Sequence, residues 1–242
     1  MINVQVVASG SGGNCYRVSD GATAVLLEAG IAFKRIREAL GFQVSDLAGC
    51  LLSHEHGDHV KAVRDLAKAG VDVYASAGTA EALGLVGHRF HIVRARVAFA
   101  IGSWTVLPFE TVHDAAEPLG FLLTSGAEKL LFATDTAYLK FRFPGLTHIM
   151  VEANYDLPVL KANVASGLVD REVKRRVIRS HMSIDTLCDF LRANELRQLR
   201  EVILLHLSDD SGDAEGFARR VREIVGRPVR VAEATTLGRV AR

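Results

Sequence analysis

Residues 53–60, SHEHGDHV, place three histidines and two acids around one glycine, directly after an apolar run. Neutral imidazole nitrogens and carboxylate oxygens are ligands that suit Zn²⁺ or Mn²⁺ in proteins. In a turn between a strand and a helix, residues two apart can point to one side and the next pair to an adjacent side. The segment therefore predicts ligands for two neighbouring metal ions, His54 and His56 for one, Asp58 and His59 for the other.

Further candidate ligands each follow an apolar, strand-like run. His113 closes WTVLPFETVH, Asp135 closes KLLFATD, and His206 closes EVILLH. We expect these strand ends to reach the same edge of the sheets and to complete the site. A carboxylate can bind two cations at once, so Asp135 is the predicted bridge. The alternative for residues 53–60 is a polar loop whose histidines cap the next helix, and the alternative for each strand ending is an incidental polar residue. Three such endings in one chain beside residues 53–60 argue against independent accidents.

Length and composition are those of an ordinary globular protein. The chain has 242 residues, 49% of them apolar, which predicts a single domain over residues 1–242 with a substantial core. The formal net charge is +1, so a polyanion would have to be held by a local patch. The sequence shows no signal peptide or membrane span, and we expect a cytoplasmic protein without a membrane partner. Cys15, Cys50 and Cys188 are expected to be buried thiols rather than disulfides.

Strand-like runs and helical patterns alternate along the chain. Short β-branched runs bounded by turn formers predict two groups of strands, and helical spacing predicts helices near residues 58–69, 79–83, 184–196 and 217–224. Ser183 is the predicted N-cap of the third of these helices. The pattern favours an α/β fold with two sheets face to face and helices outside, a four-layer αββα sandwich. Residues 157–179 are expected to be the least regular part, and they are basic.

The ligand order and the order of elements resemble the metallo-β-lactamase fold family. The segments ASGSGGNCY, HDAAEP, TDTAYL, VEANYD and LLHLSDDSGD are similar to the YycJ/WalJ group within it, DNA exonucleases related to RNase Z. The resemblance implies a metal-dependent phosphodiesterase in which two Zn²⁺ or Mn²⁺ ions activate a hydroxide. It implies a 5′ exonuclease whose substrate is DNA, with RNA as an alternative substrate. That group typically has histidine where this chain has Tyr155 and aspartate where it has Glu28.

Catalytic roles are predicted for three polar residues. Asp58 is placed to orient the hydroxide. His181, in RSHMS, resembles the histidine of RNase Z-like enzymes that precedes a small residue and then Ser or Thr, which implies a general acid for the leaving oxygen. Glu152 would hold that imidazole in the right tautomer and raise its pKa. The alternative for His181 is a loop histidine that caps the next helix.

A basic cluster just before His181 and a glycine-rich loop near the N-terminus are candidate substrate contacts. Arginine and lysine clusters bind phosphate oxygens whatever the base sequence. The loop lacks the GK[ST] of a P-loop, and a tight turn between two strands is the alternative there. An ordinary solvated face is the alternative for the basic cluster. The predicted contacts are Ser11, Asn14, Lys174, Arg175, Arg176 and Arg179.

Other functions fit the same ligand set less well. A small-molecule hydrolase, such as a cyclic-nucleotide phosphodiesterase, lactonase or thioesterase, agrees with the small net charge. A non-catalytic metal-binding module is disfavoured because the ligand set is complete. A β-lactamase would differ at Asp135 and carry an export signal, and processing of tRNA 3′ ends is disfavoured because no long flexible arm is evident. No feature of the sequence specifies an oligomer interface.

Overall fold

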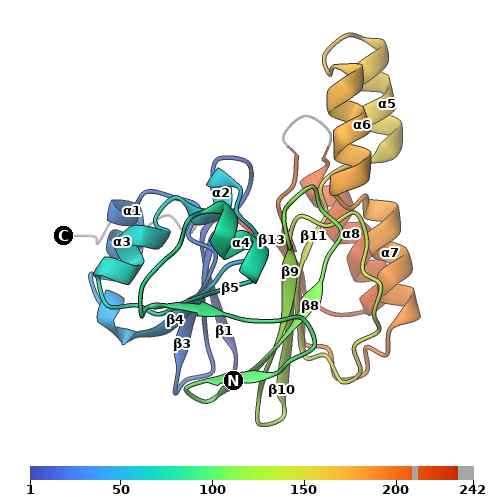
Figure 1. The fold of residues 1–242 in the computed structure, drawn as a ribbon. Coiled ribbons are helices and arrows are strands. Elements are labelled where there is room, and N and C mark those ends of the chain that lie inside the picture. The colour runs from blue at the N-terminus through green and yellow to red at the C-terminus, as the bar shows by residue number, and fades with distance from the viewer. Residues whose placement is uncertain (209–211, 234–242) are drawn as a thin grey trace, which may run out of the picture.

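The structure, a computed structural model, describes residues 1–208 and 212–233. Within these ranges, two mixed β-sheets face one another and helices lie on their outer sides (Figure 1). The expected four-layer αββα arrangement is confirmed. No helix in the described ranges is both long enough and apolar enough to cross a membrane.

The first sheet has the strand order β1-β2-β3-β4-β5-β6, antiparallel from β1 to β3 and parallel from β3 to β6. These strands are β1 (Asn3–Ala8), β2 (Cys15–Ser19), β3 (Ala24–Leu27), β4 (Leu47–Leu51), β5 (Val73–Ala75) and β6 (Phe90–Ile92). Every residue of β3 is buried, as expected for a strand covered on both faces.

The second sheet has the order β13-β12-β11-β10-β9-β8-β7, parallel from β13 to β10 and antiparallel from β10 to β7. These strands are β7 (Phe99–Ile101), β8 (Trp104–Glu110), β9 (Leu119–Ser125), β10 (Glu128–Ala133), β11 (His148–Glu152), β12 (Glu201–Leu205) and β13 (Val229–Val231). Predicted ligands follow the ends of strands β4, β8, β10 and β12, and β11 ends at Glu152.

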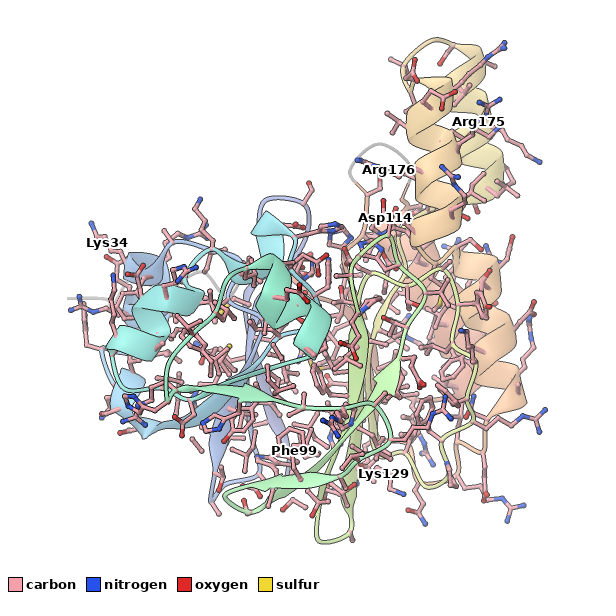
Figure 2. The ribbon with its side chains drawn as sticks, viewed as in Figure 1. Lys34, Phe99, Asp114, Lys129, Arg175 and Arg176 are labelled. Atoms are coloured by element: carbon pink, nitrogen blue, oxygen red, sulfur yellow. The ribbon has the colours of Figure 1, made fainter. Side chains whose placement is uncertain are left out.

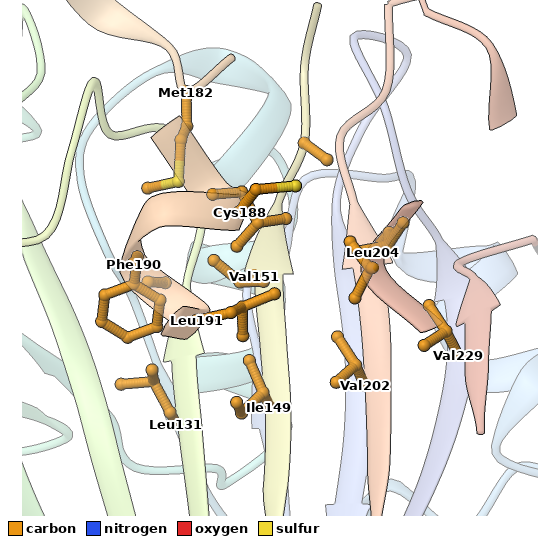
Figure 3. Close-up of a cluster of buried hydrophobic side chains, with 14 of the residues drawn as sticks. Leu131, Ile149, Val151, Met182, Cys188, Phe190, Leu191, Val202, Leu204 and Val229 are labelled. Carbon is orange, nitrogen blue, oxygen red and sulfur yellow. The ribbon is translucent and has the colours of Figure 1, made fainter. Parts of the chain in front are cut away.

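Helices cover the outer face of each sheet. The first sheet is covered by α1 (Phe33–Ala39) and α3 (Val63–Lys68), the second by α7 (Ile184–Ala193) and α8 (Ala214–Val225). Figure 3 shows Cys188, Phe190 and Leu191 of α7 packed over the second sheet. The shorter elements are η1 (Val44–Asp46), α2 (Gly57–Val60) and α4 (Ala77–Ala82). Ser183 caps α7 as predicted, accepting a hydrogen bond from the Thr186 amide.

The space between the sheets is filled by large apolar side chains from both. Tyr16 of the first sheet meets Phe132 of the second edge to face, with ring centroids 5.8 Å apart. Trp104 and Phe121 are fully buried beside them. Burial of such rings contributes about 1.5–3 kcal/mol each, so the two sheets are held together by a shared core. All three cysteines are buried free thiols, as expected.

The structure differs from two expectations about secondary structure. The helix expected over residues 58–69 is interrupted at Ala62, whose amide donates to the carbonyl of Ala29 instead of continuing the helix. The expectation that residues 157–179 are the least regular part is wrong. They form α5 (Leu157–Ala165) and α6 (Arg171–Ser180), whose N-caps are Asp156 and Asp170.

The far end of the sandwich is tied together by one carboxylate. Asp20, in the turn between β2 and β3, accepts hydrogen bonds from the hydroxyls of Ser103, between β7 and β8, and Ser125, the last residue of β9. It also accepts from the amides of Ala22 and Thr23. Partial burial opposes its ionisation, but these four donors lower the pKa of Asp20 below its usual range.

We predict that Asp20→Asn lowers the free energy of unfolding by about 1–2 kcal/mol at pH 7, because hydrogen bonds to a charged acceptor are stronger and solvent screens part of the gain. Since the folded-state pKa is depressed, this contribution is present above the unfolded pKa of about 3.9 and is lost as the pH falls below it. Urea unfolding of both proteins between pH 7 and pH 2 measures the effect. A difference that does not shrink below pH 4 would contradict this role.

Candidate metal centre

The predicted ligand loop runs from the end of β4 into α2. Its backbone is held from the other side by the Asn14 amide, which donates to the Asp58 carbonyl at 2.8 Å, and by the Ala29 amide, which donates to the His59 carbonyl at 2.7 Å. His54 and His59 are buried, while Asp58 keeps 28% of its side chain exposed. The loop is therefore fixed by the main chain and opens to solvent at Asp58.

One group of histidines converges at this edge of the sheets. The ligating atoms of His54, His56 and His113 all lie within 4.8 Å of one another. His54 Nε2 is 3.0 Å from His56 Nδ1, and His113 Nε2 is 3.2 Å from the same atom. Three imidazole nitrogens that face one common point are a suitable donor set for a single metal ion.

A second group lies directly beside the first. Its members are Asp58, His59, Asp135 and His206, whose ligating atoms also lie within 4.8 Å of one another. His59 Nε2 is 3.4 Å from Asp58 Oδ2 and 3.3 Å from Asp135 Oδ2. His206 Nε2 is 3.7 Å from Asp58 Oδ2. These His/Asp clusters are consistent with a binuclear metal site.

Asp135 stands between the two groups. Its Oδ2 is 3.7 Å from His113 Nε2 and 3.9 Å from His54 Nε2 in the first group, and 3.3 Å from His59 Nε2 in the second. The side chain is 4% exposed. This is the position that a carboxylate bridging two cations would need.

Hydrogen bonds behind the ligands determine which nitrogen faces the site. His113 Nδ1 lies 2.8 Å from the carbonyl oxygen of Ser180, and because a carbonyl can only accept, Nδ1 carries the proton and Nε2 is free. Glu28 accepts from the Ser53 amide at 3.1 Å and lies 3.4 Å from His59 Nδ1. Glu28 thus supports the ligand loop from behind.

Buried negative charge that lies beside histidines rather than lysine or arginine fits a bound cation. Glu28, Asp135 and Glu152 have side chains that are 0–4% exposed, and in the described residues their ion-pair partners are histidines rather than lysine or arginine. A buried carboxylate without a cation costs several kcal/mol. In addition, the buried His206 Nε2 has no hydrogen-bond partner among the residues described. The donor set and the charge both suit divalent metal ions.

The pKa shifts follow from this charge distribution. Burial and the neighbouring His59 lower the pKa of His54 to about 2, so its imidazole is neutral, the form that binds metal. Burial also opposes protonation of His206, but Asp135, Asp58 and Glu152 raise its pKa to about 10. Burial works against ionisation of Asp135, yet His206 and His59 hold its pKa well below the usual range. Without metal, protons on imidazoles offset the carboxylates.

His181 and Glu152 form a pair next to these groups. His181 Nδ1 lies 2.5 Å from Glu152 Oε1, and Glu152 Oε2 accepts from the Met182 amide at 3.1 Å. The ring of His181 stacks on that of His206, with centroids 5.4 Å apart. Burial lowers the pKa of His181, but the Glu152 carboxylate outweighs it and raises the pKa above the usual value. With Asp135 and His206, the pair also forms a possible ligand cluster.

A pocket of about 430 Å³ opens over the clusters. Besides candidate ligands and His181, it is lined by Ser11, Asp114 and Arg176. Asn14, in contrast, is fully buried, and its Nδ2 lies 3.3 Å from His59 Nε2, so it lies behind a candidate ligand. The structure therefore brings Ser11 and Arg176 to the pocket and places Asn14 one layer deeper.

The other predicted basic contacts lie away from this pocket. Lys174 and Arg175 line a separate groove on α5 and α6. Arg179 Nε donates to the Arg175 carbonyl at 3.3 Å on the exposed surface of α6. The basic cluster is thus divided between several faces of one helix.

Two polar residues of the site were not assigned a role from the sequence. Asn154 Nδ2 lies 3.2 Å from His206 Nδ1 and donates to the His206 carbonyl at 2.9 Å. Asp114 lines the pocket, 3.4 Å from His113 Nε2. Their positions beside Glu152 and His113 in VEANYD and HDAAEP are the signal that could have identified them.

The backbone is strained where the strands deliver these side chains. Glu28 after β3, Asp135 after β10 and His206 after β12 have φ values of 64°, 44° and 51°. This left-handed region costs non-glycine residues about 1–3 kcal/mol each and is concentrated at functional sites. The surrounding structure must therefore stabilise three unfavourable turns at one edge.

Known proteins are similar to this chain in sequence and in fold. A beta-lactamase superfamily domain matches residues 23–207. The chain is 30% identical over 240 residues to exodeoxyribonuclease YycJ of Bacillus anthracis, covering 93% of this chain and 89% of that protein. It is 28% identical over 227 residues to exodeoxyribonuclease WalJ of Streptococcus pneumoniae, covering 87% and 83%.

Structural similarity extends over almost the whole chain. The metallo-beta-lactamase fold protein YhfI of Bacillus subtilis superposes with a TM-score of 0.75 at 16% identity, covering 96% of this chain and 97% of that one. At this identity the likeness supports the fold and carries no information on substrate.

We predict that Gly30→Ala disrupts the metal centre. A Cβ at Gly30 would lie 1.6 Å from the Asp58 carbonyl oxygen, so the ligand loop must move. We expect a loss of about 1–3 kcal/mol in stability and a fall in bound metal to less than half, measured by urea unfolding and elemental analysis. Gly57→Ala is the matched control, because a Cβ there has no neighbour within 4 Å. Equal metal content in both variants would contradict the prediction.

Proposed function

Because this chain belongs to the metallo-β-lactamase superfamily and is a metal-dependent hydrolase, we propose that it hydrolyses phosphodiester bonds of DNA as a 5′ exonuclease. The observation that carries the proposal is the pocket in which both His/Asp clusters meet Arg176 and His181. The exodeoxyribonuclease relatives support DNA as the substrate, and the same chemistry would act on RNA.

The residues that would hold two Zn²⁺ or Mn²⁺ ions are those of the two clusters, with Asp135 shared between them. When bound, such ions lower the pKa of water toward neutrality and offset the charge of a phosphodiester. Asp58 is the partly exposed carboxylate of the set, and its Oδ2 faces His59 and His206. We assign to Asp58 Oδ2 the role of accepting a hydrogen bond from the attacking water and so orienting it toward phosphorus.

His181 is the proposed general acid. Its Nδ1 is held by Glu152, so Nε2 is the atom left to donate a proton, and the residue lines the pocket. His181 also caps the C-terminal end of α6, where the helix dipole favours positive charge. Protonating the leaving 3′ or 5′ oxygen would prevent the loss of a poorly stabilised alkoxide. Glu152 acts through His181 and is a positioning residue.

Arg176 and Ser11 are the proposed phosphate contacts in the pocket. A guanidinium can donate two parallel hydrogen bonds to one phosphate, which fixes the orientation as well as the charge. Ser11 lines the same pocket from the N-terminal loop. Asn14, buried beside His59, would orient that ligand rather than touch the substrate.

The proposal is tested by incubating metal-loaded protein with end-labelled single- and double-stranded DNA, matched RNA and bis-p-nitrophenyl phosphate, with Asp58→Ala as the inactive control. We expect stepwise release of nucleotides from the 5′ end of DNA. Hydrolysis of the small diester without any polynucleotide would instead favour a small-molecule hydrolase.

We predict that His181→Ala lowers turnover of DNA by about 10²–10³-fold while bound metal stays within a fifth of the wild-type amount. Turnover of bis-p-nitrophenyl phosphate should fall much less, because p-nitrophenolate leaves without a proton. Steady-state kinetics and elemental analysis measure both, and His88→Ala, at an exposed loop histidine, is the control. A parallel loss of metal and activity would make His181 a ligand, and equal losses on both substrates would refute the general acid.

A further inference from the structure

Helices α5 and α6 form a hairpin that projects from the body of the protein (Figure 1). Of the residues in these two helices, all of them described, only Leu160 and Ser180 are buried. Val173 and Ile178 are 43% and 39% exposed, and Leu168 at the tip is 78% exposed. The hairpin does not cover a sheet, so core packing does not explain it.

The hairpin has a net positive charge, whereas the rest of the chain is net negative. From residue 157 to residue 180 there are six lysines and arginines and two acids, a net charge of +4 in a chain whose formal net charge is +1. The remainder of the chain therefore has a formal net charge of −3. A local field of this sign attracts polyanions even when the net charge is near zero.

Two faces of α6 carry different cations. Arg176 lines the pocket of the metal centre. Lys161, Arg171, Lys174 and Arg175 line a groove of about 450 Å³ between the helices, here called the outer groove. Figure 2 shows Arg175 and Arg176 directed to different sides of the hairpin, with Arg176 on the side of Asp114.

The cations of the outer groove are largely without acidic partners. Arg175 pairs with Glu172 at 2.6 Å. For Lys161, Arg171 and Lys174, no carboxylate of the described residues forms an ion pair. Apolar surface from Val164 and Ile178 lies between them. Unpaired cations around a concave surface suit the phosphates of a nucleic-acid backbone.

We propose that the outer groove binds backbone phosphates of the DNA strand at a distance from the bond that is cut, so that the preferred substrate is a polymer rather than a short oligonucleotide. The proposal rests on the proposed function. Arg171 lies nine residues before Ser180, about 13.5 Å along the helix. At 3.4 Å per stacked nucleotide this is roughly four steps, and a strand that also passes around α6 must be longer.

The base of the hairpin is rigidly joined to the metal centre. The Ser180 carbonyl accepts from His113 Nδ1, and His181 follows at the end of the same helix. Arg220 of α8 pairs with Asp185 of α7 and lies 3.5 Å from Asp156, the N-cap of α5. A strand held in the outer groove is therefore held in a fixed relation to His181.

Charge complementarity favours a nucleic acid over other occupants. A second copy of the chain docked hairpin to hairpin would bring two net charges of +4 together, which repel one another. An acidic protein surface has a charge of the right sign, but its carboxylates are less regularly spaced than phosphates. The comparison with poly-L-glutamate below distinguishes an acidic polypeptide from a nucleic acid.

The test is the affinity of metal-loaded protein for a fluorescent 30-nucleotide phosphorothioate thymidine strand, which resists hydrolysis, at several salt concentrations. Arg171→Ala/Lys174→Ala is expected to weaken binding about 10- to 30-fold at 0.1 M salt and to reduce the salt slope by about 1.4, at about 0.7 per phosphate contact. Affinity for a four-nucleotide strand should change less than twofold. Both substitutions favour helix, and circular dichroism checks folding.

Lys34→Ala/Lys68→Ala removes the same charge from α1 and α3 and should leave affinity within twofold. An equal loss in this control, an unchanged affinity in the groove variant, or equally tight binding of poly-L-glutamate of matched charge would overturn the proposal. Hydrolysis of unmodified DNA by the wild-type protein is measured in parallel. Absent hydrolysis refutes the proposed function, whereas hydrolysis with unchanged binding of the groove variant refutes the outer groove alone.

Discussion

Buried negative charge is the constraint on which the site depends. Glu28, Asp135 and Glu152 are removed from solvent and have histidines as their ion-pair partners in the described residues. Such an arrangement is unfavourable for folding unless protons or metal ions neutralise it, because desolvated carboxylates are costly. Two divalent cations would satisfy the same charge and make the histidines neutral ligands. The chemistry of the pocket and the stability of the sheet edge are therefore linked through the same atoms.

The fold provides the rigidity that this arrangement needs. Three turns with left-handed φ deliver Glu28, Asp135 and His206 at the ends of three strands, and a core shared by the two sheets holds those strands in register. At the end of the sandwich away from the metal centre, Asp20 of the first sheet is hydrogen bonded to Ser103 and Ser125 of the second. Because neighbouring strands are hydrogen bonded along their length, a side chain that follows one strand is fixed relative to the side chain that follows the next.

Much of this could be predicted from the sequence, and the reasons are physical. Strands are visible as short apolar runs, so polar residues directly after them, such as His113 and Asp135, were expected at one sheet edge. The tautomer of His113 was not predictable, because it depends on a carbonyl 67 residues away. The helix α5 was missed because its apolar residues follow no helical period, and α6 was missed because its few apolar residues stand among many charged ones and are not buried. Asn14 was expected at the substrate, but its burial depends on the packing of His59.

The most direct test of the account is anomalous diffraction from crystals of the protein loaded with Mn²⁺ or Zn²⁺. The account predicts two anomalous peaks per chain about 3.5–4 Å apart, one among His54, His56 and His113 and the other among Asp58, His59 and His206, with Asp135 between them. Crystals grown with either metal that show no ordered ion at these residues, or ions bound only elsewhere, would contradict it.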